Sequence, residues 1–311
     1  MRLISLIPSV ILLLVAVVLT VNLWRRRPAT KTEWLLGALC AGSVTTYAVL
    51  VQPWDFVSYY LRPLLVVAGM GALVVSLVRA WHTPWWRSPG SWRVWLNLVT
   101  TGMVGLLFSG LSVVALTGTT PGDDRAVELA FPLQDGVAYV GQGGARTILN
   151  YHHVSRSQAY ALDIVGLNAA GLHARGVMPT EPERYAVYGR TVHSPCTGTV
   201  IEARSDLVDQ HPPTTDRVNL AGNHLVLRCS GTTPTVDVLL AHLQQGSVRL
   251  TPGARVRVGE VVGRVGNTGN TSEPHLHIHA IRTGSGSALK GEGVPIRFDG
   301  RFLVRNSLVF G

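Results

Sequence analysis

The sequence predicts a two-part α + β chain, with an N-terminal four-helix transmembrane region followed by a mostly antiparallel β-sheet domain. The first third holds four apolar stretches of about 20 residues, the length that crosses a hydrocarbon core as a helix. After Gly122 charged residues appear, Gly and Pro recur, and short strand-like segments replace the long apolar runs. We therefore divide the chain into a transmembrane region (1–118), a linker (119–129) and a β domain (130–311).

The apolar stretches set the limits of the first part. A cleavable signal peptide is the alternative for the first stretch, but its length and the arginines directly after it favour an uncleaved span. A buried helical bundle of a soluble protein is disfavoured, because the stretches are long and nearly uncharged. The predicted spans are Leu3–Trp24, Trp34–Val51, Val57–Leu77 and Val94–Leu116.

The charge distribution argues against nucleic acid as a partner. The formal net charge is +9. Residues 1–119 hold nine Lys or Arg against two Asp or Glu, a net of +7, whereas the remainder holds eighteen against sixteen, a net of +2. The excess therefore belongs to the membrane-flanking segments, and no basic patch is indicated on the folded domain.

The same charges predict the orientation. Seven basic residues fall in the first and third connections, and two fall on the other side. By the positive-inside rule the two basic connections are cytoplasmic, and tryptophans near the third fit an interfacial belt. We expect a multi-pass protein of the cytoplasmic membrane with its β domain on the extracytoplasmic side. The basic residues are Arg25, Arg26, Arg27, Lys31, Arg79, Arg87 and Arg93 against Arg2 and Arg62.

Within the β domain, segments bounded by turn residues read as strands. The stretch Pro182–Tyr188 has no clear assignment, and 166–190 either covers a groove or is an ordinary surface loop. Cys196 and Cys229 lie at strand edges, and an extracytoplasmic location permits a disulfide between them, although the sequence does not give their separation. The expected strands are Gly198–Ala203, His224–Cys229, Val236–Leu240, Val256–Val265 and Leu276–Ile281.

Histidines gather in the β domain, which contains ten of the eleven. If Leu276–Ile281 is a strand, His275, His277 and His279 share one face, while Leu276 and Ile278 point to the core. Imidazoles two residues apart on one face can offer a metal ligand and a neighbouring acid or base. A His-x-His pair alone is weak evidence for a metal site, so the interpretation depends on the other motifs of the domain. His173, His193 and His211 have no motif support and are expected at the surface or in loops.

In chain order, these motifs are His152 and Asp163, then His242-Leu243, then Pro274-His275-Leu276-His277 after a glycine-rich run. With Gly222-Asn223 before a strand, this order resembles the lysostaphin-like family of bacterial cell-wall zinc endopeptidases over about Phe131–Ile281.

The resemblance implies a zinc site and its catalytic partners. His152, Asp163 and His277 would hold one Zn²⁺ per chain, with water in the fourth position, as hydrolytic zinc sites require. His242 and His275 would be unligated and would deprotonate the water and stabilise the oxyanion and leaving amine.

Two features depart from the family pattern. Ten residues separate His152 from Asp163 where the family commonly has three, so His153 remains a competing ligand. His279 stands where many members carry an acid; it is either a partner of a ligand or a satisfied polar residue. Asn223 is a candidate for positioning backbone or substrate.

The leading functional hypothesis is a zinc endopeptidase acting on peptidoglycan peptides outside the cytoplasmic membrane. One alternative is a catalytically silent regulator or binding module of other wall hydrolases, and another is a peptidase with a non-wall protein substrate. Besides the wall peptide and the lipid bilayer, membrane proteins are possible partners, since one span would suffice as an anchor.

Overall fold

The computed structural model describes residues 7–122, 126–284 and 290–311, so the start of the first predicted span and residues 123–125 of the predicted linker lie outside the described residues. The chain divides into a helical unit (residues up to Trp54, and Ser58–Leu116) and a sheet unit that combines Thr117–Gly311 with the short segment Asp55–Val57. We describe each unit by itself.

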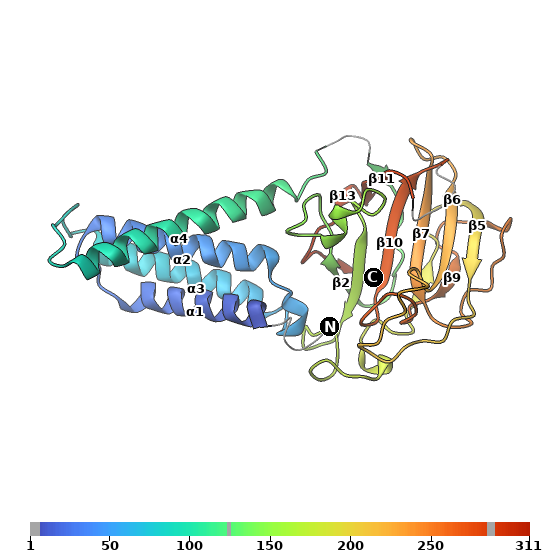
Figure 1. Ribbon diagram of the computed structural model, residues 1–311, viewed down its shortest axis with the longest axis horizontal. Helices are drawn as coiled ribbons and strands as arrows, with labels where there is room; N and C mark the ends of the chain where they lie inside the picture. The colour runs from blue at the N-terminus through green and yellow to red at the C-terminus, as the bar shows by residue number, and fades with distance from the viewer. Residues whose placement is uncertain (1–6, 123–125, 285–289) are drawn as a thin grey trace. The chain divides into compact units, whose positions relative to one another are not determined.

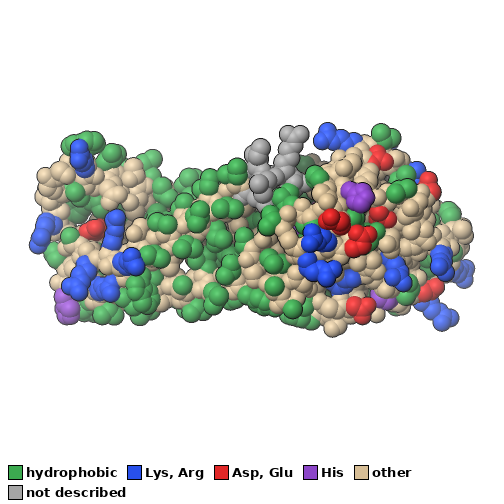
Figure 2. All heavy atoms as spheres, turned by 90° about the horizontal axis from the view of Figure 1, so that it is seen from below, with side chains coloured by type: hydrophobic (Ala, Val, Ile, Leu, Met, Phe, Trp, Pro, Cys, Tyr) green, Lys and Arg blue, Asp and Glu red, His purple; other side chains and the backbone are tan. Residues whose placement is uncertain are grey.

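The helical unit contains four long helices, as the sequence predicts. They are α1 (Ile7–Arg25), α2 (Lys31–Val51), α3 (Leu61–Ala80) and α4 (Trp92–Thr117). Each is long and apolar enough to cross a membrane. Large apolar side chains face outward, for example Val67, which is 68% exposed, and Leu106, which is 67% exposed. Figure 2 shows hydrophobic side chains spread over the visible face of this unit.

Small residues form the buried surfaces between the helices. Ala41, Ala72 and Gly105 are among the buried positions. A Cβ at Gly105 would lie 3.0 Å from Leu39 and 3.1 Å from the backbone nitrogen of Cys40, so α4 packs on α2 with almost no side chain between them. Close approach at small residues is typical of helices that pack within a bilayer, where van der Waals contact drives association.

The sheet unit is built on an antiparallel sheet in the order β14-β2-β3-β10-β7-β6-β5-β8, with β11 also paired to β10 (Figure 1). The outer strands are β14 (Leu308–Phe310), β2 (Val137–Gln142), β5 (Gly198–Arg204) and β8 (Arg255–Val256). The inner strands are β3 (Leu162–Leu167), β10 (Leu276–Arg282), β7 (Val236–Leu243) and β6 (Asn223–Cys229), and β11 is Gly293–Val294.

Smaller elements surround the sheet. Parallel pairing joins β1 to β12, β13 pairs with β12, and β4 pairs with β9. Their bounds are β1 (Val127–Glu128), β4 (Thr191–His193), β9 (Val261–Arg264), β12 (Ile296–Phe298) and β13 (Arg301–Phe302), with short 3₁₀ turns η2 (Trp54–Phe56), η3 (Tyr151–Val154) and η4 (Pro182–Arg184).

Two local expectations change in the structure. The predicted strand Val256–Val265 is divided into β8 and β9, because a turn with Gly259 at φ +81° interrupts it. Strand β1 lies inside 119–129, the predicted linker, and pairs with β12, so the sheet unit begins before residue 130.

The main core lies on the face of the sheet that carries Leu276 and Ile278, both fully buried, as the alternation in β10 predicts. The disulfide between Cys196 and Cys229 is formed, with a Cα–Cα distance of 5.7 Å. It ties the end of β6 to the segment that enters β5. The opposite face of β10 carries His277 and His279, and these side chains are buried as well.

Candidate active site

Strand register brings three distant segments together at one end of the sheet. β10 lies between β3 and β7, so His277 has Asp163 as its partner on one side and Ala241 on the other. His242, the next residue of β7, and His275, just before β10, therefore fall beside the same pair. Residues more than a hundred positions apart meet because the strands pair in this order.

Three side chains, those of His152, Asp163 and His277, bring atoms that can bind a metal close to one another. The Nε2 atom of His152 lies 3.0 and 2.9 Å from the two carboxylate oxygens of Asp163. The Nδ1 atom of His277 lies 2.8 Å from one of them. All three ligand atoms lie within 4.8 Å of each other, and the residues are buried. Two imidazoles and a carboxylate fit a hydrolytic zinc centre, which keeps a further position for water.

The turn η3, which carries both His152 and His153, directs the two side chains to different partners. The side chain of Asn150 accepts from the backbone N–H of His152 and donates to the carbonyl oxygen of Ala161, both at 3.1 Å. This amide thereby holds the turn η3 against the start of β3. His152 then faces Asp163, whereas His153 turns to the carbonyl of Ala159, 2.9 Å from its Nδ1 atom. The ten intervening residues are accommodated as a loop closed by Asn150.

His279 contacts a predicted ligand directly. Its Nδ1 atom lies 2.9 Å from the Nε2 atom of His277, and its side chain is buried. One nitrogen of His277 thus faces Asp163 and the other faces His279. A partner on the second ring nitrogen fixes the orientation and tautomer of a metal-bound histidine.

His242 and His275 form the other side of the cluster. The Nδ1 atom of His242 lies 2.8 Å from the carbonyl oxygen of Thr268, and that of His275 lies 2.9 Å from the carbonyl oxygen of Glu273. Because a carbonyl only accepts, each Nδ1 carries the proton in the neutral ring and each Nε2 is left as an acceptor. The Nε2 atom of His275 lies 3.5 Å from Asp163. With His277 these two histidines make a second, overlapping group of potential ligands that contains no carboxylate.

The backbone at His242 is unusual. Its φ of +62° lies in the left-handed region, which a residue with a Cβ adopts rarely. Such conformations cluster at functional sites, where surrounding contacts hold them in place. Here the backbone N–H of His242 donates to Ala221 and its carbonyl accepts from Gly266, so both sides of the residue are fixed.

The electrostatics favour an ionised Asp163 beside neutral His242 and His277. Burial alone would raise the pKa of Asp163, but the neighbouring His152 and His275 hold it well below its usual range. Burial lowers the pKa of His277 to about 4, and burial together with His275 and His277 keeps that of His242 well below its usual range. Burial also lowers the pKa of His275, but the negative charge of Asp163 raises it by more, so the pKa of His275 is raised overall. Neutral imidazoles and an ionised carboxylate are the forms that bind a metal cation.

Asn223 lies away from this cluster and positions backbone. Its side chain accepts from the N–H of Leu207 at 2.9 Å and donates to the carbonyl of the same residue at 2.7 Å. Its own N–H donates to Thr268 Oγ1 at 2.8 Å. Thr268 in turn supplies the carbonyl that holds His242. Gly222 makes this approach possible, since a Cβ there would lie 2.2 Å from the Thr268 carbonyl oxygen.

Two further groups at the site had no role in the sequence analysis. The hydroxyl of Tyr151 donates to Asp163 at 3.2 Å, and its ring packs on His152 at a centroid distance of 4.0 Å. The only sequence feature that could have indicated a role for Tyr151 is its position next to His152. His173, expected at the surface or in a loop, lies in a loop but is only 4% exposed, and its Nε2 atom lies 3.5 Å from the carboxylate of Glu273, the residue whose carbonyl holds His275.

Sequence comparison gives one family match. Residues 184–289 match the model of peptidase family M23. The matched range includes His242, His275 and His277, while His152 and Asp163 lie upstream of it. No curated protein sequence matches the chain.

Three solved structures illustrate the similarity. The solution structure of lysostaphin is 18% identical over 40% of this chain and 36% of its own, with a TM-score of 0.26. The catalytic domain of the antimicrobial peptidase lysostaphin from Staphylococcus simulans is 18% identical over 42% of this chain and 80% of its own, with a TM-score of 0.26. A zinc-containing peptidase from Vibrio cholerae is 21% identical over 43% and 50%, with a TM-score of 0.25. The chain thus spans about a third of the length of full lysostaphin.

Proposed function

We propose that the M23 domain of this chain is a zinc-dependent endopeptidase that hydrolyses peptide bonds of peptidoglycan outside the cytoplasmic membrane. One observation carries the proposal: the candidate ligands His152, Asp163 and His277 adjoin two further imidazoles, those of His242 and His275, which each have a ring nitrogen within 4.8 Å of one in His277. A structural metal site would be closed by its ligands and would need no such neighbours.

The roles follow from the geometry of the side chains. His152, Asp163 and His277 would hold the ion, and zinc, when bound, lowers the pKa of a coordinated water and polarises a carbonyl. His242 stays neutral and can accept a proton at Nε2. His275, whose pKa Asp163 raises, can in its protonated form donate from its Nε2 atom to the developing oxyanion or to the leaving amine. The Thr268 and Glu273 carbonyls keep both rings in these orientations.

The choice of substrate and location is supported by the resemblance and by the predicted topology. The basic connections of the helical unit point to an extracytoplasmic sheet unit, where the wall polymer lies. Lysostaphin, one of the similar structures, is an antimicrobial peptidase. A non-wall protein substrate and a catalytically silent regulator are the alternatives, and the intact set of five site residues argues against the latter.

The test uses the full-length protein in detergent and three variants. Zinc content and release of soluble muropeptides from purified walls are measured for wild type, Asp163→Ala and His275→Ala, with His211→Ala as the control outside the cluster. We expect one zinc per chain, lost only in Asp163→Ala because that change removes a ligand. Cleavage should be abolished in Asp163→Ala and reduced about 10²- to 10⁴-fold in His275→Ala, the usual effect of losing a general acid or base.

The outcomes separate the hypotheses. Zinc binding without cleavage of any wall preparation would favour the regulator or a non-wall substrate. Absence of zinc in the folded wild-type protein would overturn the site assignment. Loss of zinc in His275→Ala would move that histidine into the ligand set.

A further inference from the structure

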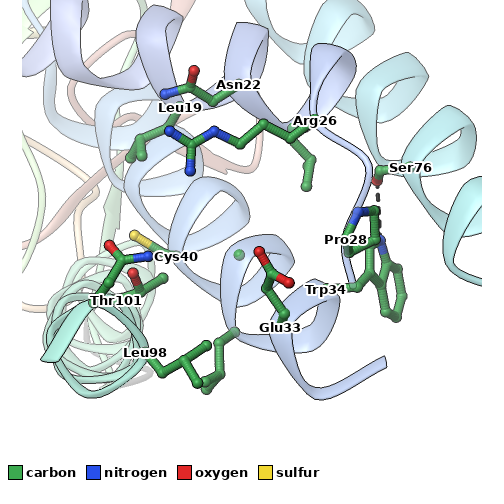
Figure 3. Close-up of a pocket in the computed structure, with 14 residues that line it drawn as sticks. Leu19, Asn22, Arg26, Pro28, Glu33, Trp34, Cys40, Ser76, Leu98 and Thr101 are labelled. Atoms are coloured by element: carbon green, nitrogen blue, oxygen red, sulfur yellow. Dashed lines mark hydrogen bonds between the residues drawn. The ribbon is translucent and has the colours of Figure 1, made fainter. Parts of the chain in front are cut away.

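The helical unit contains a partly open cavity of about 240 Å³, lined by both apolar and polar side chains, that has no part in the proposed catalysis. Its walls come from α1, the connection to α2, and the helices α2, α3 and α4. Figure 3 shows the guanidinium of Arg26 and the carboxylate of Glu33 both directed into the hollow, together with the amide of Asn22. The lining is Leu19, Asn22, Leu23, Arg26, Pro28, Glu33, Trp34, Leu36, Gly37, Cys40, Ser76, Asn97, Leu98 and Thr101.

The two charges face the same space without pairing. Among the described residues no ion pair joins Arg26 to Glu33 or to any other acid. Glu33 is fixed in the wall by the start of α2: its Oε2 atom accepts from the N–H of Ala29 at 2.8 Å, and its own N–H donates to Thr30 Oγ1 at 3.1 Å. The other carboxylate oxygen remains available to a ligand.

Arg26 is exposed and Glu33 is half-buried, and two opposite charges that line one cavity indicate a ligand that carries both signs. Long charged side chains near the ends of membrane helices extend to the membrane interface, which is the level of the lipid headgroups. A simple anion would be attracted by Arg26 and repelled by Glu33, and a simple cation would meet the reverse. A phosphate joined to an ammonium group by a short link matches both.

The remainder of the lining favours the headgroup of a lipid. Leu19, Leu23 and Leu98 supply apolar surface beside the charges, and the indole of Trp34 is held by its bond to Ser76 at 3.0 Å. The cavity is smaller than the roughly 300–1,000 Å³ of drug-sized sites, so it suits a headgroup whose acyl chains lie outside.

Exposed tryptophans, including Trp24 and Trp81, lie at the ends of α1 and α3 that adjoin the first and third connections. Arg26 and Ser76, which line the cavity, lie near these same helix ends. Tryptophans at this position are typical of the headgroup level of a membrane.

We propose that this cavity binds the headgroup of a zwitterionic aminophospholipid, with the phosphate on Arg26 and Asn22 and the ammonium on Glu33. The inference depends on the proposed membrane location of the helices and is independent of the peptidase activity. It gives the four-helix region a ligand of its own in addition to anchoring.

The test is native mass spectrometry of the full-length protein released from detergent micelles. Equimolar phosphatidylethanolamine and phosphatidylglycerol compete for the protein, and soluble phosphoethanolamine is offered separately. The variants are Arg26→Gln and Glu33→Gln; the glutamine at 33 keeps an oxygen for the Ala29 N–H. Arg27→Gln, one position further along and outside the lining, is the matched control. Each variant is first shown to be monodisperse.

We expect wild type and Arg27→Gln to retain one phosphatidylethanolamine about tenfold better than phosphatidylglycerol, the effect of one charge-assisted contact. Arg26→Gln should lose about tenfold in retention of both lipids, and Glu33→Gln should lose the preference while keeping phosphatidylglycerol. Equal retention by wild type and both cavity variants would overturn the proposal. So would a wild-type preference for phosphatidylglycerol, or retention of soluble phosphoethanolamine as strong as that of the lipid.

Discussion

Replacement of His279 tests whether the contact between two buried imidazoles governs metal affinity. The Nδ1 atom of His279 lies 2.9 Å from the Nε2 atom of His277, whose Nδ1 atom faces Asp163 at 2.8 Å. When His277 binds a metal through Nδ1, its Nε2 carries the proton and donates it to His279. Removal of the acceptor leaves a buried N–H unpaired and frees the ring to rotate.

The expected loss can be estimated from comparable sites. Mutation of the partner of a metal-bound histidine typically costs 10- to 100-fold in metal affinity, which is about 1.4–2.8 kcal/mol. We expect this loss in His279→Phe, which fills the space but accepts no hydrogen bond. His279→Gln retains a carbonyl oxygen and should lose less than tenfold.

The assay is zinc competition against a chromophoric chelator, with thermal unfolding of the metal-free protein as a check on folding. His153→Gln is the matched control, because His153 neighbours a predicted ligand but turns to the carbonyl of Ala159. An unchanged zinc affinity in folded His279→Phe would refute the reasoning, as would an equal loss in His153→Gln.

Two further predictions concern stability. Removal of the disulfide by Cys196→Ser should lower the free energy of unfolding by about 3–4 kcal/mol, because the bond to Cys229 closes a loop with a sequence separation of 33; urea denaturation with and without reductant checks this. Burial alone would lower the pKa of His173, but contact with Glu273 and the charge of Asp55 raise it to about 9. The folded state therefore holds this proton more tightly than the unfolded chain, whose histidine pKa is about 6.5. The stabilisation that protonated His173 contributes should be complete below about pH 6.5 and should disappear as the pH rises through about 9. The check is the melting temperature as a function of pH; a decline as steep in His173→Gln as in wild type would contradict this.

The sequence by itself determined the features that depend on local pattern. An apolar run of sufficient length becomes a helix wherever it lies, and all four predicted spans are helices in the structure, with ends shifted by a few residues. Alternation along Leu276–Ile281 likewise placed the leucine and isoleucine in the core and the histidines on the other face. The residue types and their order, compared with a known family, were enough to select the five members of the cluster.

The tertiary structure decided what depends on contacts between distant segments. His152 and His153 are adjacent and chemically identical, and only the hydrogen bonds of Asn150 across the loop orient one of them to Asp163. Buried His173 contacts Glu273, which lies one hundred positions further along the chain. The predicted strand Val256–Val265 is broken because each half pairs with a different partner, β5 or β4.

The physical reason is the range of the interactions. Helix length and strand alternation are set by neighbours within a few residues, so the sequence states them directly. Strand register, loop closure and the choice of hydrogen-bond partner depend on interaction energies between segments that meet only in the folded chain. The residue types of the candidate site could therefore be predicted from the sequence. Which of their atoms face one another is determined by the pairing of β3, β10 and β7.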